Sequence, residues 1–231
     1  MAATTGFAAP VDINMHMALP NSPTIIRHVE VKSLLDLRGE HVVIQHRDFS
    51  CGASSLATIL RYYLGEEVHE LDVINGLLEV AKEHGTLEKI IERRGFSLLD
   101  LKSYAEALGY KSAGYRLEYQ DLVDLNMPAI VPIIPNGYKH FVVFRGADKN
   151  FVYLADPSFG NLVESVAQFK YEWYGYTNVA LVVFRPESEK NDKEQPPLTL
   201  SELDKINVVT DGLDSFLYYQ ISAPPRYSPT F

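Results

Sequence analysis

Cys51 is the only cysteine among the 231 residues, and it directly precedes a stretch with helical periodicity. A helix N-terminus favours a negatively charged group, and the thiolate is the reactive form of cysteine. A single cysteine is more often a small buried hydrophobe than a nucleophile. Here Gly52 and Ala53 leave space beside the thiol, and Cys51 lies off the apolar stripe, so the sequence predicts a cysteine nucleophile. The stripe that defines the helix face consists of Leu56, Ile59, Leu60, Tyr63 and Leu64.

A nucleophilic thiol needs a base, and the base needs a group that orients it. Among the seven histidines, His140 begins a strand of the strongest predicted hairpin. If the hairpin turn is centred on Asp148, His140 lies directly opposite Asp156, and opposed residues share one face of a sheet. His46 is nearer to Cys51 in sequence, but no carboxylate is apparent beside it. The alternative interpretation is a solvated histidine and a turn-forming Asp-Pro pair.

Gln45 lies six residues before the cysteine. Acyl transfer from a peptide forms an oxyanion, which needs preorganised hydrogen-bond donors. The Gln45 amide and the Cys51 backbone N–H would supply two. A lone glutamine is a weak signal, but Gln45, Cys51, His140 and Asp156 together form a specific one.

The first half of the chain is predicted to be mainly helical. Residues 42–44 form a short strand leading to Gln45, the Cys51 helix ends near Gly65, and further helices cover 70–82 and 98–108. A capping box of Ser97 and Asp100 begins the last helix, Gly109 ends it, and the apolar face of 70–82 consists of Leu71, Ile74, Leu78 and Ala81.

The second half changes to strand periodicity. Strands are predicted at 129–134, 140–145, 151–155 and 179–184, and Pro132 argues for an edge strand or a bulge in the first of them. Helices followed by an antiparallel sheet define the α+β class.

Composition narrows the possible functions. Hydrophobic residues make up 46% of the chain, which suits a globular core, and the formal net charge is -9. The negative charge makes nucleic acid and anionic membrane surfaces unsuitable partners. No apolar run approaches the ~20 residues of a membrane span. One cysteine excludes an internal disulfide and a cysteine-based metal cluster, and we expect no cofactor.

Four segments are expected along the chain. Residues 1–39 form an extended, proline-containing arm, 40–185 the main domain, 186–197 a charged linker, and 198–231 an aromatic tail that packs on the domain or on a partner. The first residues lack a signal-peptide pattern but look like what remains after cleavage at small residues.

Six stretches carry a resemblance to a known family: 45–52, 53–63, 95–101, 105–110, 137–143 and 154–157. In this order they resemble the bacterial papain-like cysteine peptidases that process double-glycine leader peptides, and the resemblance spans roughly residues 40–185. It implies a papain-like α+β fold and a thioacyl mechanism. It further implies Cys51 as nucleophile, His140 as general base and acid, Asp156 as orienting residue and Gln45 as oxyanion donor.

The sequence departs from transporter-fused members, in which an Asp commonly precedes the cysteine where Ser50 stands here. Without a phosphate-binding loop or a membrane span, the chain resembles the stand-alone branch. Some members of that branch accompany secretion systems for surface amyloid or pilus-like fibres. This implies a periplasmic location (alternatively cytoplasmic), an exported or fibre-forming substrate, and a secretion-apparatus partner, and it leaves double-glycine specificity open.

Two other functions remain. Family-like domains without the cysteine bind substrates for export, so a non-catalytic leader-recognition module is one alternative. A papain-like acyltransferase, with the same thioester but an acceptor other than water, is the second.

Overall fold

The computed structural model describes residues 11–17, 25–31, 38–175 and 178–186. Most of the predicted charged linker and all of the predicted aromatic tail lie outside these residues. The described chain contains a two-stranded sheet, in which β1 (Val11–Met17) and β2 (Ile25–Val31) pair antiparallel, and a six-stranded sheet. The sequence predicts only an extended arm where β1 and β2 lie.

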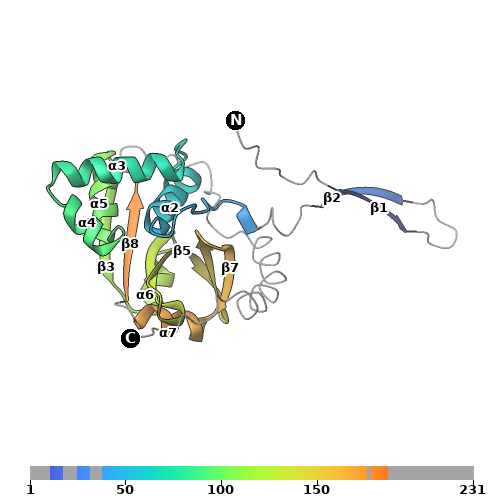
Figure 1. Ribbon diagram of the computed structural model, residues 1–231. Helices are drawn as coiled ribbons and strands as arrows, with labels where there is room; N and C mark the ends of the chain where they lie inside the picture. Colours follow the sequence, from blue (N-terminus) through green and yellow to red (C-terminus); the bar gives the residue numbers. More distant parts are fainter. Residues whose placement is uncertain (1–10, 18–24, 32–37, 176–177, 187–231) are drawn as a thin grey trace, which may run out of the picture.

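The six-stranded sheet is antiparallel throughout and has the order β3-β8-β4-β5-β6-β7. Figure 1 shows it with helices against it, which confirms the predicted α+β class. Its strands are β3 (Lys111–Arg116), β4 (Ala129–Ile133), β5 (His140–Ala147), β6 (Phe151–Asp156), β7 (Gly160–Ser165) and β8 (Val179–Phe184).

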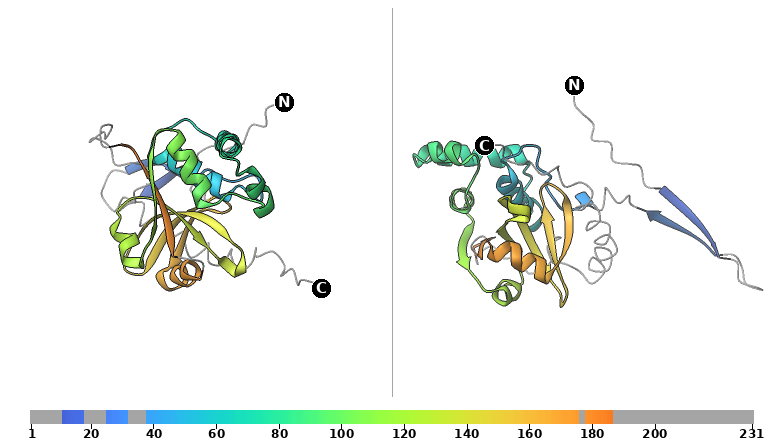
Figure 2. Two further views of the ribbon diagram at one scale, coloured as in Figure 1. Left: turned by 90° about the vertical axis from the view of Figure 1, so that its left-hand side faces the viewer. Right: turned by 60° about the horizontal axis from the view of Figure 1, so that its bottom comes forward.

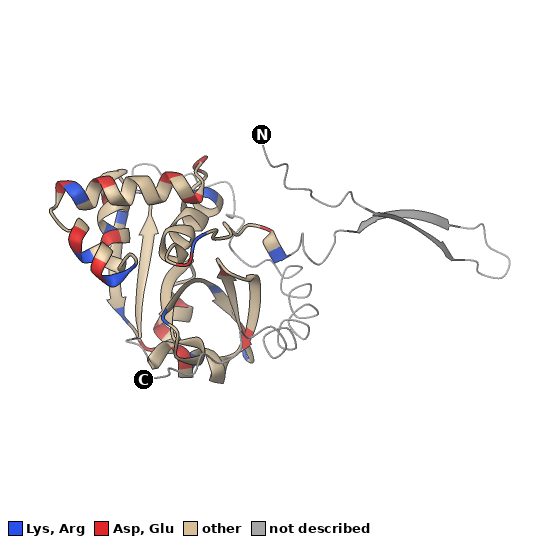
Figure 3. Ribbon diagram, viewed as in Figure 1, with Lys and Arg blue, Asp and Glu red and all other residues tan. Residues whose placement is uncertain are grey.

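The helices form two groups, which the views of Figure 2 separate. The first group is α2 (Cys51–Thr58) with its π-helical extension η1 (Ile59–Tyr63), α3 (Glu70–Glu83), α4 (Leu87–Arg93) and α5 (Leu98–Ala107). The second is α6 (Tyr119–Asp124) and α7 (Val166–Tyr174). Figure 3 shows charged residues gathered on α3 and α4, whereas β8 between the two groups carries none.

Each face of the sheet has its own core, because successive strand residues point to opposite faces. On β5, Val143 packs with the α2, α3 and α5 side chains, whereas Val142 and Phe144 pack with Phe169 and Trp173 of α7. The sheet is therefore covered on both faces.

Several predicted elements are confirmed. The capping box of Ser97 and Asp100 begins α5, Gly109 follows its end with φ +91°, and the Cys51 helix ends at Leu64, just before Gly65. Besides β1 and β2, five elements were not predicted by the sequence patterns: β3, α4, α6, β7 and α7.

Three local expectations are wrong. Residues 42–44 form no strand, because Val43 N donates to the Thr58 hydroxyl at 3.0 Å and Gln45 N to Pro157 O at 2.8 Å, so these amides do not pair with a neighbouring strand. Strand β4 is an interior strand; Pro132 lies opposite Phe141 of β5, past the point where Ile130 pairs with Leu181 of β8.

The third wrong expectation is the buried face of α3. Leu71 is 51% exposed, and the buried apolar side chains of α3 are Val73, Ile74, Leu77 and Ala81. The helix is rotated relative to the predicted face because it packs against both α2 and α5.

The segment that leads into the domain lies tightly over the β6–β7 turn. Gly160 has φ +84°, and a Cβ there would come within 2.2 Å of Arg38 O. Asn161 Nδ2 donates to Glu40 O at 2.9 Å, and Gln45 N to Pro157 O. Residues 38–45 are thereby fixed against the turn that follows Asp156.

Candidate active site

Cys51 is the first residue of α2, and it is 8% exposed. Helix α2 lies close to β5, because a Cβ at Gly52 would be only 3.2 Å from the Phe141 ring, and Ser55 Oγ donates to Phe141 O at 3.2 Å. The glycine after the cysteine therefore permits the close approach that brings Cys51 next to the start of β5. From the sequence we expect Gly52 to leave space for the thiol, whereas the structure uses it for packing.

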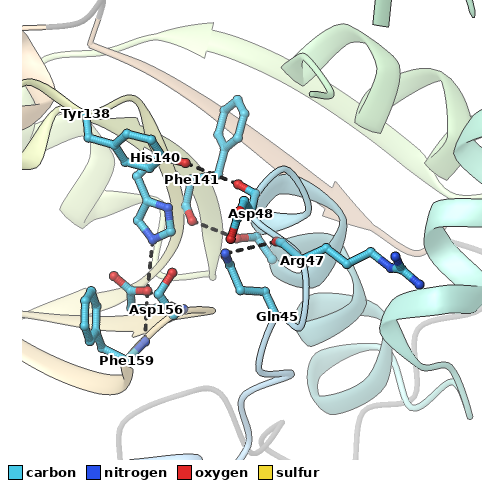
Figure 4. Close-up of polar contacts among 10 residues, drawn as sticks. Gln45, Arg47, Asp48, Tyr138, His140, Phe141, Asp156 and Phe159 are labelled. Carbon is cyan, nitrogen blue, oxygen red and sulfur yellow. Dashed lines mark hydrogen bonds and ion pairs between the residues drawn. The ribbon is translucent and has the colours of Figure 1, made fainter. Parts of the chain in front are cut away.

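His140 begins β5 and Asp156 ends β6, and both are buried. His140 Nε2 lies 2.9 Å from Asp156 Oδ1, as Figure 4 shows. A turn centred on Asp148 would place the two residues directly opposite each other, and this prediction is wrong. Val143 pairs with Ala155, so the register continued by one residue places Asp156 opposite Val142, and a bulge lies between Phe144 and Gly146. His140 is two residues from Val142 on the same face, so the contact runs diagonally across the ladder.

Asp156 Oδ1 accepts two further hydrogen bonds, from Ser158 N at 2.6 Å and Phe159 N at 3.2 Å. These bonds fix the carboxylate in the turn that follows β6. Asp156 Oδ2 is buried and has no hydrogen-bond partner.

His140 is the most strongly perturbed base of the site. Burial would lower its pKa, but hydrogen bonds with Asp156 and Cys51, together with negative charge on both, outweigh burial and raise the pKa of His140 to about 10. With Nε2 bound to Asp156, Nδ1 is left for the thiol. His140 is therefore an imidazolium at neutral pH, placed between a carboxylate and Cys51.

Gln45 lies in the irregular loop before α2, and its backbone is bonded to Pro157, the residue after Asp156. The side-chain Nε2 donates to Arg47 O at 3.2 Å, and Oε1 is buried without a partner. An amide nitrogen carries two N–H donors, so one remains. Figure 4 shows Gln45 beside His140 and Asp156. Cys51 is hydrogen-bonded to His140, so the structure brings all four predicted residues to one place.

A second histidine–carboxylate pair lies beside the site. His46 Nδ1 is 2.9 Å from Glu70 Oε2, so the expectation that His46 has no carboxylate beside it is wrong. The His46 side chain is 78% exposed, whereas that of His140 is 4% exposed. The sequence could not reveal Glu70, because 24 residues and a whole helix separate it from His46.

Tyr138 is a further neighbour, which the sequence patterns did not single out. Its hydroxyl donates to Asp48 O at 3.2 Å, and its ring centroid is 6.3 Å from that of His140. The turn before His140 is thus linked to the loop before Cys51.

Two carboxyl groups, the partly buried Glu164 and the buried Glu172, lie near Asp156. Burial first, then the charges of Glu172 and Asp156, raises the pKa of Glu164 to about 8, and Glu164 Oε2 has no hydrogen-bond partner. Burial and Asp156 also raise the pKa of Glu172, against the opposing effects of Gln168 and His140. At neutral pH Glu164 is therefore mostly protonated.

Within the described ranges, no group of three or more His, Cys, Asp or Glu side chains could hold a metal ion. The same part of the chain contains no helix that is both long and apolar enough to cross a membrane.

Comparison with known proteins gives concordant results. The sequence profile of the Peptidase C39 family matches residues 39–188. The chain is 36% identical over 218 residues to "Probable functional amyloid protease FapD" of Pseudomonas aeruginosa, covering 91% of this chain and 87% of that protein. It is 37% identical over 194 residues to the protein of the same name in Pseudomonas fluorescens, covering 82% of this chain and 80% of that protein.

Solved structures share the fold. A double-glycine-motif protease from an AMS/PCAT transporter, in complex with the leader peptide, has a TM-score of 0.51 and 25% identity and covers 63% of this chain and 91% of that one. The peptidase domain of Streptococcus ComA has a TM-score of 0.50 and 24% identity, with 63% and 98% coverage.

Fold and comparisons together define a papain-like cysteine peptidase, an enzyme that acts on peptide substrates. The chain belongs to the peptidase C39 family.

Proposed function

We propose that this chain is an endopeptidase that cleaves an exported protein through a thioacyl intermediate on Cys51. The Cys51 thiolate attacks the scissile carbonyl, and the Gln45 amide and the Cys51 N–H hold the resulting oxyanion. The His140 imidazolium gives its proton to the leaving amine. It then accepts a proton from the water that hydrolyses the thioester, while Asp156 holds the ring.

The observation that carries this proposal is the buried hydrogen-bonded series Cys51–His140–Asp156. Burying charged groups costs free energy unless they are paired. A module that only binds leader peptides has no need of such a series, so hydrolysis is favoured over the binding alternative. No contact among the described residues favours an acyl acceptor other than water.

For the substrate, we propose a fibre-forming protein of a bacterial export system, handled in the periplasm together with a partner from the secretion apparatus. The support is that two relatives at 36% and 37% identity are named functional amyloid proteases. Double-glycine specificity is a narrower proposal, and its support is the likeness to a double-glycine-motif protease solved in complex with the leader peptide.

The test is mass spectrometry of the full chain incubated with peptides from exported, fibre-forming candidates. Wild type should cleave one of them, and an acid quench should trap an acyl adduct on Cys51. Cys51→Ala should give neither product nor adduct, with an unchanged circular dichroism spectrum. Cleavage by Cys51→Ala at the wild-type rate would exclude the thioacyl mechanism.

A further inference from the structure

The loop between Gln45 and Cys51 is held by a carboxylate that takes no part in the proposed chemistry. Glu70, the first residue of α3, is 5% exposed. Its Oε1 accepts from Ser50 Oγ at 2.5 Å and from His46 N at 2.9 Å, and its Oε2 lies 2.9 Å from His46 Nδ1. One buried side chain thus binds both ends of the 46–50 segment.

The contact joins Glu70, the first residue of α3, to Ser50, the residue before α2. Ser50 precedes α2, yet its side chain makes no capping hydrogen bond to that helix. Its hydroxyl lies instead against Glu70 and against Arg47 O, at 2.7 Å. A hydroxyl has one proton, and a hydrogen bond to a charged acceptor is the stronger one.

The same Arg47 carbonyl accepts the hydrogen bond from Gln45 Nε2. When the Ser50 hydroxyl donates to Glu70, the Arg47 carbonyl accepts from Ser50 N at 3.2 Å, and its second lone pair is left to orient the Gln45 amide. Hydrogen bonds therefore connect Glu70 to the proposed oxyanion donor: Glu70 accepts from the Ser50 hydroxyl, and the Ser50 backbone N–H and the Gln45 amide donate to the same Arg47 oxygen. This connection does not pass through His140 or Asp156.

We propose that Glu70 is a positioning residue of the peptidase reaction, which fixes the 45–50 loop so that the Gln45 amide faces the oxyanion formed at Cys51. The inference rests on the proposed function. It predicts an effect on turnover, because an oxyanion donor acts mainly in the transition state. Cys51 and His140 are held by α2 and β5, so their contact does not depend on this loop in the same way.

The variants are Glu70→Ala, which removes both acceptor oxygens, and Glu70→Gln, which keeps one oxygen for Ser50 and His46 N. Glu83→Ala, at an exposed position of the same helix, is the matched control. We expect Glu70→Ala to lower kcat on the order of 10- to 100-fold with little change in KM, since small displacements of reacting groups have effects of this size. Glu70→Gln should recover part of the loss.

Two readouts separate positioning from general stabilisation. Alkylation of Cys51 by iodoacetamide should stay within about twofold of wild type in both Glu70 variants, because it needs no oxyanion donor. In a double-mutant cycle, either Glu70 substitution should lower kcat several-fold less in the Gln45→Ala background than in wild type.

Equal fold-changes in both backgrounds, or parallel losses of kcat and alkylation, would overturn the positioning role. If Glu70→Ala does not fold, Glu70→Gln gives the same two readouts. The proposed function fails separately, if Cys51→Ala still cleaves. If Cys51→Ala is inactive, Gln45→Ala is slow and both Glu70 variants match wild type, only the positioning role of Glu70 fails.

Discussion

His140 and Asp156 meet at 2.9 Å diagonally across the β5–β6 ladder, between residues that are not directly opposed. The bulge between Phe144 and Gly146 shifts the register, but both side chains stay on one face. The contact ties the start of one strand to the turn after the next, so it holds the imidazole ring from two elements at once.

Asp156→Asn should retain far more activity than Asp156→Ala. All three hydrogen bonds to Asp156 go to Oδ1, and Oδ2 has no partner, so an amide can keep the oxygen in place and put its nitrogen where no bond is lost. Steady-state kinetics of both variants, with circular dichroism as the folding control, checks this. Equal losses would mean that the negative charge itself is required.

The alkaline limb of kcat/KM should lie near pH 9–10, because the pKa of His140 is raised to about 10 and the imidazolium persists to that range. Asp156→Asn removes a charge that raises this pKa, so its limb should move to lower pH. A profile from pH 5 to 10.5 measures both. A wild-type limb near the ordinary histidine value of 6.5 would contradict the ion pair.

Cys51 should react with iodoacetamide at pH 6 faster in wild type than in His140→Ala, by about tenfold or more, because the imidazolium favours the thiolate. His84→Ala, at an exposed position after α3, is the control and should match wild type. If the His140 variant alkylates as fast as wild type, the two side chains are not coupled.

Gln45→Ala should lower kcat by a factor on the order of 100 with little change in KM, because an oxyanion donor acts mainly in the transition state. The remaining Nε2 proton, beside the one bound to Arg47 O, is the group that is lost. A variant that changes KM alone would assign Gln45 to substrate binding instead.

Glu164→Gln should stabilise the protein in alkali. The folded-state pKa of Glu164 is raised from 4.5 to about 8, mainly by burial, so the unfolded chain releases this proton first and stability falls as the pH rises from about 4.5 to 8. The substitution removes that loss. Urea unfolding at pH 8.5 should show a gain of up to about 4 kcal/mol, reduced by solvent screening of this partly buried group, and unfolding at pH 4.5 should show little change.

Glu83→Gln, at an exposed position of α3, provides the control for this measurement. A gain that is the same at both pH values would indicate better packing and would remove the titration of Glu164 as its cause.

Local signals in the sequence were reliable where the structure is locally determined. The Ser97 cap and the Cys51 helix depend on neighbours within a few residues, and both could be read directly. The shared face of His140 and Asp156 followed from strand periodicity. Their register did not, because Gly146, which lies at the bulge after Phe144 with φ +149°, falls outside the predicted strand 140–145.

Long-range contacts account for most of the features that the sequence does not predict. Glu70 contacts His46 and Ser50, which lie 24 and 20 residues earlier in the sequence, so no local sequence pattern marks these contacts. Residues 42–44 have strand-forming residue types. However, Val43 N donates to the Thr58 hydroxyl and Gln45 N donates to Pro157 O, so no strand pairing forms there. Helix α7 did carry a readable signal, since Ser165 caps it through Gln168 N.

The close contact between Gly160 and Arg38 limits how far the chain can be truncated from its N-terminal side without loss of activity. Arg38 O would lie 2.2 Å from a Cβ at Gly160. Asn161 Nδ2 donates to Glu40 O, and Gln45 N donates to Pro157 O. Residues 38–45 therefore act as a strap across the turn that follows Asp156. A shortened chain that begins at Gln45 would keep all four site residues and lose the strap. We therefore expect the smallest active unit to begin no later than Arg38, well before the first group that touches the substrate in the proposed reaction.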